Sequence, residues 1–265
     1  MFLKKPIQKL NDSLKLSRMK YLSDQKGIVN RYIREKNGWD EHNKQCKNFI
    51  LKSAASKIKG KVVVLGSGWL LDVPLKELSE QFEEVLLIDI IHPPQVLKKI
   101  EQYKNVSTQK SDITGGLIDY VFNTIKTDKK EKTKTLLTAG ELFSYSIPPA
   151  ADFVVSLNLM TQLNILLTDF MKSSKLYTDN ELQHFALQVQ KSHVNILPKE
   201  KSCLITEYEE ELYDENGQLL GVNPLIFVDL PKSKLAETKW KWKFDSSMTY
   251  REDVKTWFNV VALDF

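Results

Sequence analysis

Residues 61–68 read KVVVLGSG, and this stretch decides the fold that we expect of the chain. The run 61–65 is too apolar to alternate between a buried and an exposed face, which is typical of a strand buried on both sides in a parallel sheet. Gly66 and Gly68 then indicate a tight turn. A helix over 70–81 with Pro74 in its first turn, and a second buried strand at 85–89, complete a strand, turn, helix, strand unit.

The alternation of strands and helices continues downstream of this unit. Thr178 and Glu181 have the spacing of a capping box, the polar stretch from Thr127 to Thr135 predicts a surface loop, and Asn216-Gly217 predicts a hairpin turn. Further strands are expected at 105–109, 152–158, 202–207, 240–244 and 256–263, and helices at 117–125, 159–171 and 178–193. The sequence therefore predicts an α/β fold, Rossmann-like, with a mostly parallel sheet.

A helical segment is expected before the first strand. Apolar residues recur at helical intervals between 11 and 56, and Trp39, His42 and Cys46 fall on one stripe. Gly27 and the pair Asn37-Gly38 predict breaks between two or three helices. We expect residues 1–58 to form an N-terminal helical extension or lid, and residues 59–265 to form the Rossmann-like domain.

Length and composition exclude several classes of protein. The chain has 265 residues, of which 42% are hydrophobic and 27% charged, as in a globular soluble protein. No signal-peptide pattern and no run of 18 apolar residues occurs, so we expect a cytoplasmic protein without a membrane partner. Cys46 and Cys203 lie far apart without the spacing of metal ligands, which predicts buried thiols and no metal site.

The charge of the chain is uneven. The first 61 residues hold 16 Lys and Arg against 5 Asp and Glu, whereas the remaining 204 hold 22 against 29. The basic segment could bind an anionic partner such as RNA, or it could be the solvated face of helices that pack on an acidic body. An acidic run, Glu207 and Glu209 to Glu211, likewise allows a solvated edge or recognition of a cationic substrate or metal. Trp240, Trp242 and Phe244 alternate with lysines and predict one buried sheet face.

Polar residues follow the expected parallel strands, where the ligand crevice of such a sheet lies. They are Gly66, Ser67, Gly68, Asp89, Asp112, Ser156 and Asn158. Glycines let a backbone approach a ligand closely, and a carboxylate can accept both hydrogen bonds of a ribose diol. The pattern predicts a nucleoside site, and its spacing also suits a nicotinamide cofactor.

These segments resemble the class I S-adenosylmethionine-dependent methyltransferases. The similar pieces are VVVLGSGWLLDVPL at 62–75, VLLID at 85–89, SDI at 111–113 and ADFVVSLNLMTQL at 151–163. The resemblance covers roughly residues 55–265 and implies seven strands, with the last antiparallel and helices on both faces. It also implies S-adenosylmethionine as cofactor, with Gly66 and Gly68 at the methionine part, Asp89 at the ribose, Asp112 at the adenine, and Ser156 and Asn158 toward the acceptor.

The sequence departs from this family at two positions. Val64 stands where an acidic residue is usual, and Leu70 where a glycine or another small residue is usual. Asp72 is the nearest polar substitute, and it could face the ligand or favour a helix N-terminus.

We therefore expect methyl transfer from S-adenosylmethionine to an acceptor that the sequence does not identify. The alternative is a catalytically silent methyltransferase-like domain that binds a nucleoside, RNA or a protein. Positioning supplies much of the catalysis of an in-line displacement, and a base is needed only where the acceptor must lose a proton. His92, Asn158 and His42 are the candidate catalytic residues, although packing alone would also explain His42.

Overall fold

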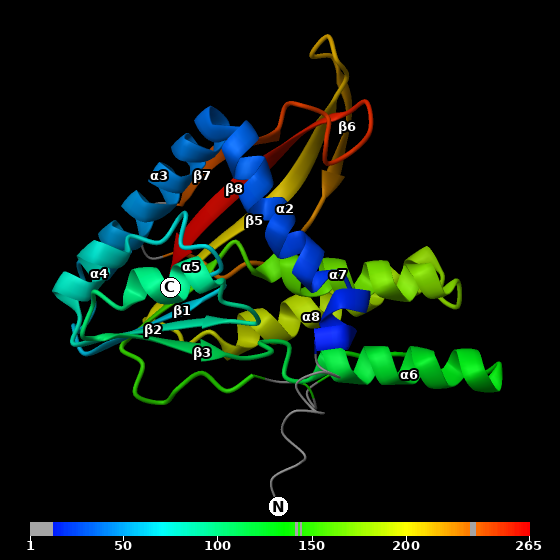
Figure 1. Ribbon diagram of the computed structural model, residues 1–265, viewed down its shortest axis with the longest axis horizontal. Helices are drawn as coiled ribbons and strands as arrows, with labels where there is room; N and C mark the ends of the chain where they lie inside the picture. Colours follow the sequence, from blue (N-terminus) through cyan, green and yellow to red (C-terminus); the bar gives the residue numbers. More distant parts are fainter. Residues whose placement is uncertain (1–12, 141–142, 144, 234–236) are drawn as a thin grey trace, which may run out of the picture.

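The protein is described here by a computed structural model, in which residues 13–140, 143, 145–233 and 237–265 are placed. These residues contain one eight-stranded sheet in the order β3-β2-β1-β4-β5-β8-β7, with β6 paired to the outer part of β5 (Figure 1). The strands are β1 (Lys61–Leu65), β2 (Glu84–Asp89), β3 (Val106–Lys110), β4 (Phe153–Leu157), β5 (Ser202–Tyr213), β6 (Leu219–Pro224), β7 (Thr238–Asp245) and β8 (Lys255–Asp264).

The first five strands are parallel, and β8 runs antiparallel to both of its neighbours, β5 and β7. The predicted Rossmann-like class and the antiparallel last strand are confirmed. The count of seven strands is wrong by one, because the second arm of the hairpin at Asn216-Gly217 forms β6.

Helices cover both faces of the sheet (Figure 1). The helices are α2 (Tyr21–Arg34), α3 (Lys36–Ala54), α4 (Leu75–Gln81), α5 (Pro94–Ile100), α6 (Leu117–Glu131), α7 (Met160–Ser174) and α8 (Asp179–Ile196). Apolar side chains of α3, α4 and α5 share one core with the sheet, and α7 and α8 pack on the opposite face. α6 packs mainly on α7, in a further apolar cluster.

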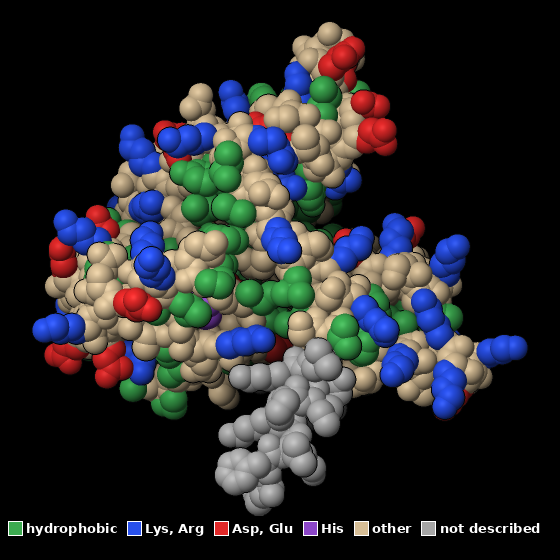
Figure 2. Space-filling model, in the orientation of Figure 1, with side chains coloured by type: hydrophobic (Ala, Val, Ile, Leu, Met, Phe, Trp, Pro, Cys, Tyr) green, Lys and Arg blue, Asp and Glu red, His purple; other side chains and the backbone are tan. Residues whose placement is uncertain are grey.

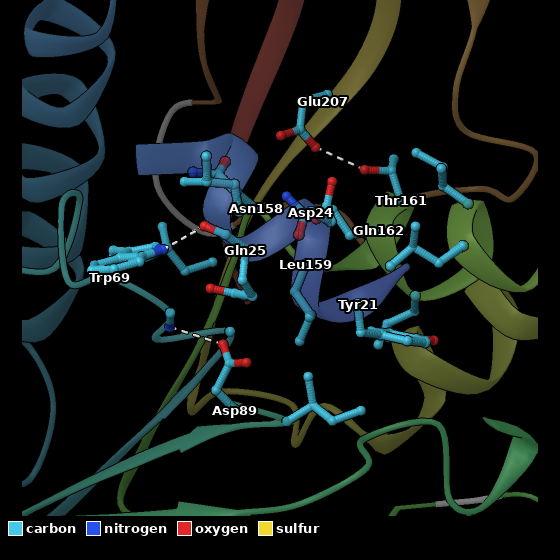
Figure 3. Close-up of a pocket in the computed structure, with 18 of the residues that line it drawn as sticks. Tyr21, Asp24, Gln25, Trp69, Asp89, Asn158, Leu159, Thr161, Gln162 and Glu207 are labelled. Atoms are coloured by element: carbon cyan, nitrogen blue, oxygen red, sulfur yellow. Dashed lines mark hydrogen bonds between the residues drawn. The ribbon is translucent and has the colours of Figure 1, made fainter. Parts of the chain in front are cut away.

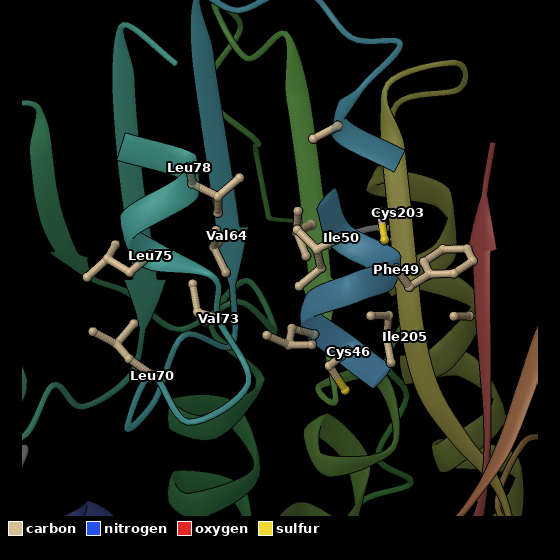
Figure 4. Close-up of a cluster of buried hydrophobic side chains, with 14 of the residues drawn as sticks. Cys46, Phe49, Ile50, Val64, Leu70, Val73, Leu75, Leu78, Cys203 and Ile205 are labelled. Carbon is tan, nitrogen blue, oxygen red and sulfur yellow. The ribbon is translucent and has the colours of Figure 1, made fainter. Parts of the chain in front are cut away.

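Strand β1 is buried on both sides, as its sequence predicts. Val62 and Val64 point to the face covered by α3 and α4, whereas Val63 and Leu65 point to the other face. Figure 4 shows Val64 among the side chains of α4 and its preceding loop, with Cys46 and Ile50 of α3 beside β5. Cys46 and Cys203 are both free and buried.

Several predicted helix ends are wrong. α6 continues to Glu131, through half of the segment predicted as a loop, because its lysines face solvent while Asp128 is buried and accepts hydrogen bonds from Thr133 and Thr135. The helix predicted from residue 70 begins only at Leu75, because Leu70 has a left-handed backbone (φ 58°) and Pro74 precedes the first turn. The capping box of α8 is confirmed, with Thr178 and Glu181 bonded reciprocally.

The predicted helix breaks at Gly27 and Asn37-Gly38 are also wrong. Gly27 lies within α2 and Gly38 within α3, and the two helices meet at Glu35. Close packing requires glycine at position 38, because a Cβ there would lie 2.5 Å from the backbone oxygen of Lys243 in β7. This glycine therefore marks a close approach of helix to strand and not a chain break.

The basic N-terminal quarter packs on the acidic remainder. Lys15, Lys57 and Lys61 form ion pairs with Asp119, Asp264 and Glu84 respectively. Figure 2 shows Lys and Arg side chains spread over the visible face without a single concentrated patch. These pairings account for part of the charge asymmetry, and RNA binding by residues 1–61 stays a prediction. None of the helices in the described ranges is both long enough and apolar enough to cross a membrane.

Candidate functional site

A pocket of about 690 Å³ opens at the carboxyl ends of β1, β2 and β4 and beside the middle of β5. This volume is in the range of small-molecule sites. Six of the seven predicted cofactor-binding residues line it together, although they lie up to 92 positions apart: Gly66, Ser67, Gly68, Asp89, Asp112 and Asn158. Parallel strands bring their carboxyl ends to one edge of a sheet, which is why this part of the prediction follows from the strand pattern.

The turn after β1 is built from glycine conformations. Gly66 has φ 81° and Gly68 φ 37°, both left-handed. A Cβ on Gly66 would lie 2.8 Å from the backbone oxygen of Leu157, so only glycine fits beside β4. Because these two positions carry no side chains, the backbone of the turn is exposed to the pocket.

Asp89 connects the end of β2 to this turn. Its Oδ2 accepts a hydrogen bond from the Gly68 amide (2.8 Å) and its Oδ1 one from the Ile91 amide (3.2 Å). Burial raises the pKa of Asp89 to about 6, although these backbone donors oppose the rise. A carboxylate has about four acceptor positions, so two remain for a ligand.

Asp112 is held rigidly in the loop after β3. Its Oδ1 accepts from the Thr114 amide (2.9 Å) and its Oδ2 from the Gly116 amide (3.2 Å). Burial raises its pKa above the ordinary value. The carboxyl group therefore lines the pocket from a fixed loop beside the start of α6.

Asn158 joins three buried or partly buried side chains at the end of β4. Its Nδ2 donates to Asp72 Oδ2 (2.7 Å) and lies 2.9 Å from His42 Nε2 and 3.8 Å from Cys46 Sγ. His42, Cys46 and Asp72 offer atoms within 4.8 Å of one another, as metal ligands would, but the amide of Asn158 takes the space between them. Asn158 Oδ1 is buried, without a hydrogen-bond partner among the described residues.

His42 lines the pocket as part of an aromatic wall. Its ring stacks on Trp242 with a centroid separation of 3.8 Å, and its Nδ1 accepts from Trp240 Nε1 (3.1 Å). Burial lowers the pKa of His42 to about 3, so the ring is neutral at physiological pH. Trp242 also contacts Phe258, and both rings line the pocket.

Two predicted site residues do not line the pocket. Ser156 is fully buried, and its Oγ lies 2.7 Å from His193 Nε2 on α8. His92 is partly buried beside the turn after β1, with its Nε2 3.1 Å from Ser67 Oγ. Ser156 therefore joins the sheet to α8, and His92 supports the turn from outside the lining.

The two residues that depart from the family pattern, Val64 and Leu70, both have their side chains in the core. Val64 is fully buried in the core and does not reach the pocket, whereas Asp72 does. Leu70 keeps the left-handed backbone typical of glycine while its side chain fills the core beside α4 (Figure 4).

Glu207 and Glu210 line the pocket and are buried, whereas the sequence left open whether their acidic run is a solvated edge or recognises a cationic substrate or metal. A bulge in β5 lies between Glu207 and Glu209, so that Glu207 pairs with Val260 and Glu210 with Phe258. Residues three apart would face opposite sides of a regular strand, but the extra residue, Tyr208, brings both carboxylates to the pocket face. No simple sequence signal marks such a bulge.

Helix α2 covers the pocket. Its lining residues recur at helical spacing: Tyr21, Asp24, Gln25, Ile28 and Arg31. Trp69 Nε1, from the turn after β1, donates to the backbone oxygen of Gln25 (2.8 Å; Figure 3). Arg31 lies over the rings of Phe244 and Tyr250, so the helix contacts both the turn after β1 and the aromatic side chains of Phe244 and Tyr250.

No family model matches the sequence, and no curated protein sequence matches it. Among solved structures, the chain is similar to the N-methyltransferase NodS from Bradyrhizobium japonicum WM9, with 11% identity over 85% of this chain and 96% of that one and a TM-score of 0.39. It is similar to an S-adenosylmethionine-dependent methyltransferase from Clostridium acetobutylicum ATCC 824, with 12% identity over 70% of this chain and 57% of that one and a TM-score of 0.31. It is also similar to the 23S rRNA methyltransferase ErmE, with 11% identity over 83% of this chain and 67% of that one and a TM-score of 0.30.

Proposed function

We propose that this protein transfers a methyl group from S-adenosylmethionine to an acceptor bound in the same pocket. The observation that carries the proposal is the meeting of the glycine turn, Asp89 and Asp112 around one pocket at the carboxyl ends of β1 and β2. Each has the chemistry expected for a different part of S-adenosylmethionine.

The residues present fit the donor. The two remaining acceptor positions of Asp89 suit a ribose diol, and Asp112 can accept from the adenine amino group. The space beside Gly66 and Gly68 suits the methionine part, and Asp72 supplies the carboxylate that Val64 cannot. When bound, the donor supplies a methyl group on a positively charged sulfur.

The protein's own contribution to such a reaction is positioning and exclusion of water. The aromatic wall and α2 enclose the pocket, and fixed loops hold Asp89 and Asp112. Orientation of this kind accounts for much of the rate of a displacement reaction.

We further propose that α2 acts as the lid of the N-terminal extension. Tyr21 is its buried hydrophobic residue, whereas α3 buries Trp39, Cys46, Phe49 and Ile50 in the sheet core. Elements with few buried contacts open at low free-energy cost. The proposed lid therefore consists of α2 without α3, because α3 belongs to the same core as the sheet.

Calorimetry with S-adenosylmethionine and S-adenosylhomocysteine tests the proposal. We expect both to bind the wild-type protein, and Asp89→Ala to weaken binding at least about tenfold, because the ribose loses its carboxylate partner. Asp229→Ala, at an exposed carboxylate outside the pocket, is the matched control. Absence of binding to wild-type protein would remove the proposed function, and unchanged binding by Asp89→Ala would remove the site assignment.

A second candidate, a silent domain that binds the donor without turnover, is favoured by Val64. Methyl-labelled S-adenosylmethionine incubated with extract of the source cell separates the two. Transfer of label by the wild-type protein, and not by Asp89→Ala, is expected of an enzyme. Donor binding without any such transfer would indicate the silent domain.

A further inference from the structure

We propose that the acceptor is an amine that binds as a cation at Glu207, at the end of the pocket farthest from Asp89. This inference rests on the proposed function, since it assigns the acceptor of the same reaction. In Figure 3, Asp89 and Glu207 lie at opposite ends of the drawn side chains, with Asn158 and Leu159 between them. Asp89 ends β2 and Glu207 lies within β5, and these two strands are three strand spacings, or about 14 Å, apart in the sheet.

The charge of the pocket lining exceeds what the donor needs. Seven carboxyl side chains and three basic side chains line it: Asp24, Asp72, Asp89, Asp112, Asp169, Glu207 and Glu210 against Lys20, Arg31 and Arg251. S-adenosylmethionine carries a sulfonium, an ammonium and a carboxylate, which neutralise one negative charge. The lining therefore favours a second cation beside the donor.

Glu207 and Glu210 share a face of β5, but their partners differ. Glu210 is neutralised by Arg251, whose Nη2 lies 2.7 and 2.9 Å from its two oxygens. Glu207 is only 4% exposed, and its Oε2 accepts from Thr161 Oγ1 at 2.8 Å (Figure 3). No cation forms a salt bridge with it in the described part of the chain, and a buried carboxylate without such a partner is costly.

Asn158 provides an independent indication of the ligand. Asn158 lines the pocket, its Oδ1 is buried without a hydrogen-bond partner among the described residues, and its Nδ2 donates to Asp72. Glu207 and Asn158 Oδ1 therefore both offer acceptors. An ammonium group, with three N–H donors and no acceptor, matches them, whereas an anionic or purely accepting ligand does not.

The wall beside Glu207 also suits a cation. Phe258 pairs across the sheet with Glu210, two residues along β8 from the partner of Glu207, and Trp242 pairs with Phe258. Both rings are at most 9% exposed and line the pocket. Aromatic rings at such a site attract a desolvated cation and shield it from water.

The chemical step balances without a further reactant. The ammonium gives one proton to the Glu207 carboxylate, and the neutral nitrogen attacks the methyl carbon of the donor. The nitrogen–carbon bond forms as the carbon–sulfur bond breaks, the bonding electron pair stays on sulfur, and the product is an N-methylammonium. Burial and the nearby Asp72 raise the pKa of Glu207, which makes its carboxylate a better proton acceptor.

Three ligands with the same ring and different ends test the proposal: 2-phenylethylamine, 2-phenylethanol and 3-phenylpropanoate. Each is titrated by calorimetry into protein saturated with S-adenosylhomocysteine at neutral pH. We expect the amine to bind at least about tenfold more tightly than the alcohol, and the acid more weakly than both. Equal binding of amine and alcohol, tighter binding of the acid, or no binding of the amine would overturn the proposal.

Glu207→Gln keeps the shape of the side chain and removes its charge, so the preference for the amine should fall to less than about threefold. Glu209→Gln is the matched control, because Glu209 accepts from Asn259 Nδ2 at 3.2 Å on the other sheet face. Thr161→Val, which frees Glu207 to reorient, should reduce the preference and serves if Glu207→Gln does not fold. A preference that survives these two changes contradicts the assignment to Glu207.

The affinity for S-adenosylhomocysteine separates this proposal from the proposed function. Both variants should bind it as the wild type does, because Glu207 and Thr161 lie at the other end of the pocket. If S-adenosylhomocysteine fails to bind wild-type protein, the methyltransferase proposal fails. If it binds and the amine preference is absent, only the acceptor assignment fails.

Discussion

The indole nitrogen of Trp69 donates a hydrogen bond of 2.8 Å to the backbone oxygen of Gln25. The donor belongs to the turn that follows β1, and the acceptor to the helix that covers the pocket. The turn and its cover are thus connected directly, so loosening this bond should change how long a ligand stays bound.

Trp69→Phe removes the N–H donor and retains an aromatic ring. We expect S-adenosylhomocysteine to dissociate about fivefold faster, because a net hydrogen bond is worth about 1 kcal/mol. Stopped-flow dissociation and hydrogen exchange over residues 21–34 measure the effect. Trp257→Phe is the control, since the buried Nε1 of Trp257 has no hydrogen-bond partner in the described residues. Equal dissociation from the two variants would show that α2 is not held by this bond.

Donor affinity should depend on pH through Asp89, whose pKa burial raises to about 6. Ribose binding uses the ionised carboxylate, so affinity should fall about tenfold for each pH unit below 6. Its contribution to folding has the opposite sign: the folded state holds the proton more tightly than the unfolded state, so stability falls as pH rises from about 4 to 6. Calorimetry with S-adenosylhomocysteine between pH 5 and 8 tests this. Asp89→Asn should bind weakly, without that slope, and an unchanged slope would exclude Asp89 as its origin.

At position 70 we expect the glycine variant to be more stable than the alanine variant, which is the reverse of the usual order. The left-handed backbone (φ 58°) costs an alanine roughly 1–2 kcal/mol that glycine does not lose. Both substitutions remove a buried side chain, with a loss of about 2–5 kcal/mol. Leu70→Gly should therefore be more stable than Leu70→Ala by roughly 1 kcal/mol in denaturant unfolding. A more stable alanine variant would mean that the backbone at this position is not strained.

Ser156→Ala should affect folding and not the donor. The substitution leaves His193 buried without its hydroxyl partner, which costs about 1–3 kcal/mol of unfolding free energy. Affinity for S-adenosylhomocysteine should stay within about twofold of the wild type, because Ser156 does not line the pocket. Thermal unfolding measures the change in stability, and calorimetry measures the affinity for S-adenosylhomocysteine. Weakened binding at unchanged stability would show that Ser156 contributes to the binding site.

Gly27 and Gly38 should respond in opposite ways to alanine, although both lie inside helices. A Cβ on Gly27 meets nothing within 4 Å, so Gly27→Ala should stabilise the protein by about 0.5–1 kcal/mol. A Cβ on Gly38 would lie 2.5 Å from the Lys243 backbone oxygen, so Gly38→Ala should destabilise it by about 1–3 kcal/mol. Unfolding midpoints compare the two. A stabilising Gly38→Ala would show that α3 and β7 separate easily.

The part of the site that the sequence predicted follows from one regularity. Residues that end parallel strands meet at one edge, which brings Gly66, Asp89, Asp112 and Asn158 together without any knowledge of long-range packing. The fold class followed from the same strands, because a continuous apolar run such as 61–65 is typical of a strand that is buried on both faces of a parallel sheet.

The arrangement of carboxylates at the Glu207 end of the pocket could not be predicted in this way. Glu207 and Glu210 share a face only because Tyr208 is an extra residue in β5, and a bulge depends on pairing with β8. Ser156 was placed in the site because it follows the strand pattern, but side-chain direction alternates, and it points to α8. The end of α6 was missed because a polar sequence on a solvent-facing helix looks like a loop.

The pocket is closed by segments from the two ends of the chain. Arg31 of α2 lies over Phe244 and Tyr250, and Trp39 Nε1 donates to the backbone oxygen of Phe244. During synthesis, α2 leaves the ribosome about two hundred residues before β7 and β8, so the pocket is completed only after the segment that contains these two strands has been made. A nascent chain halted before residue 238 would hold β1 to β5 and yet lack Trp242, Phe244 and Phe258, which form one wall of the pocket.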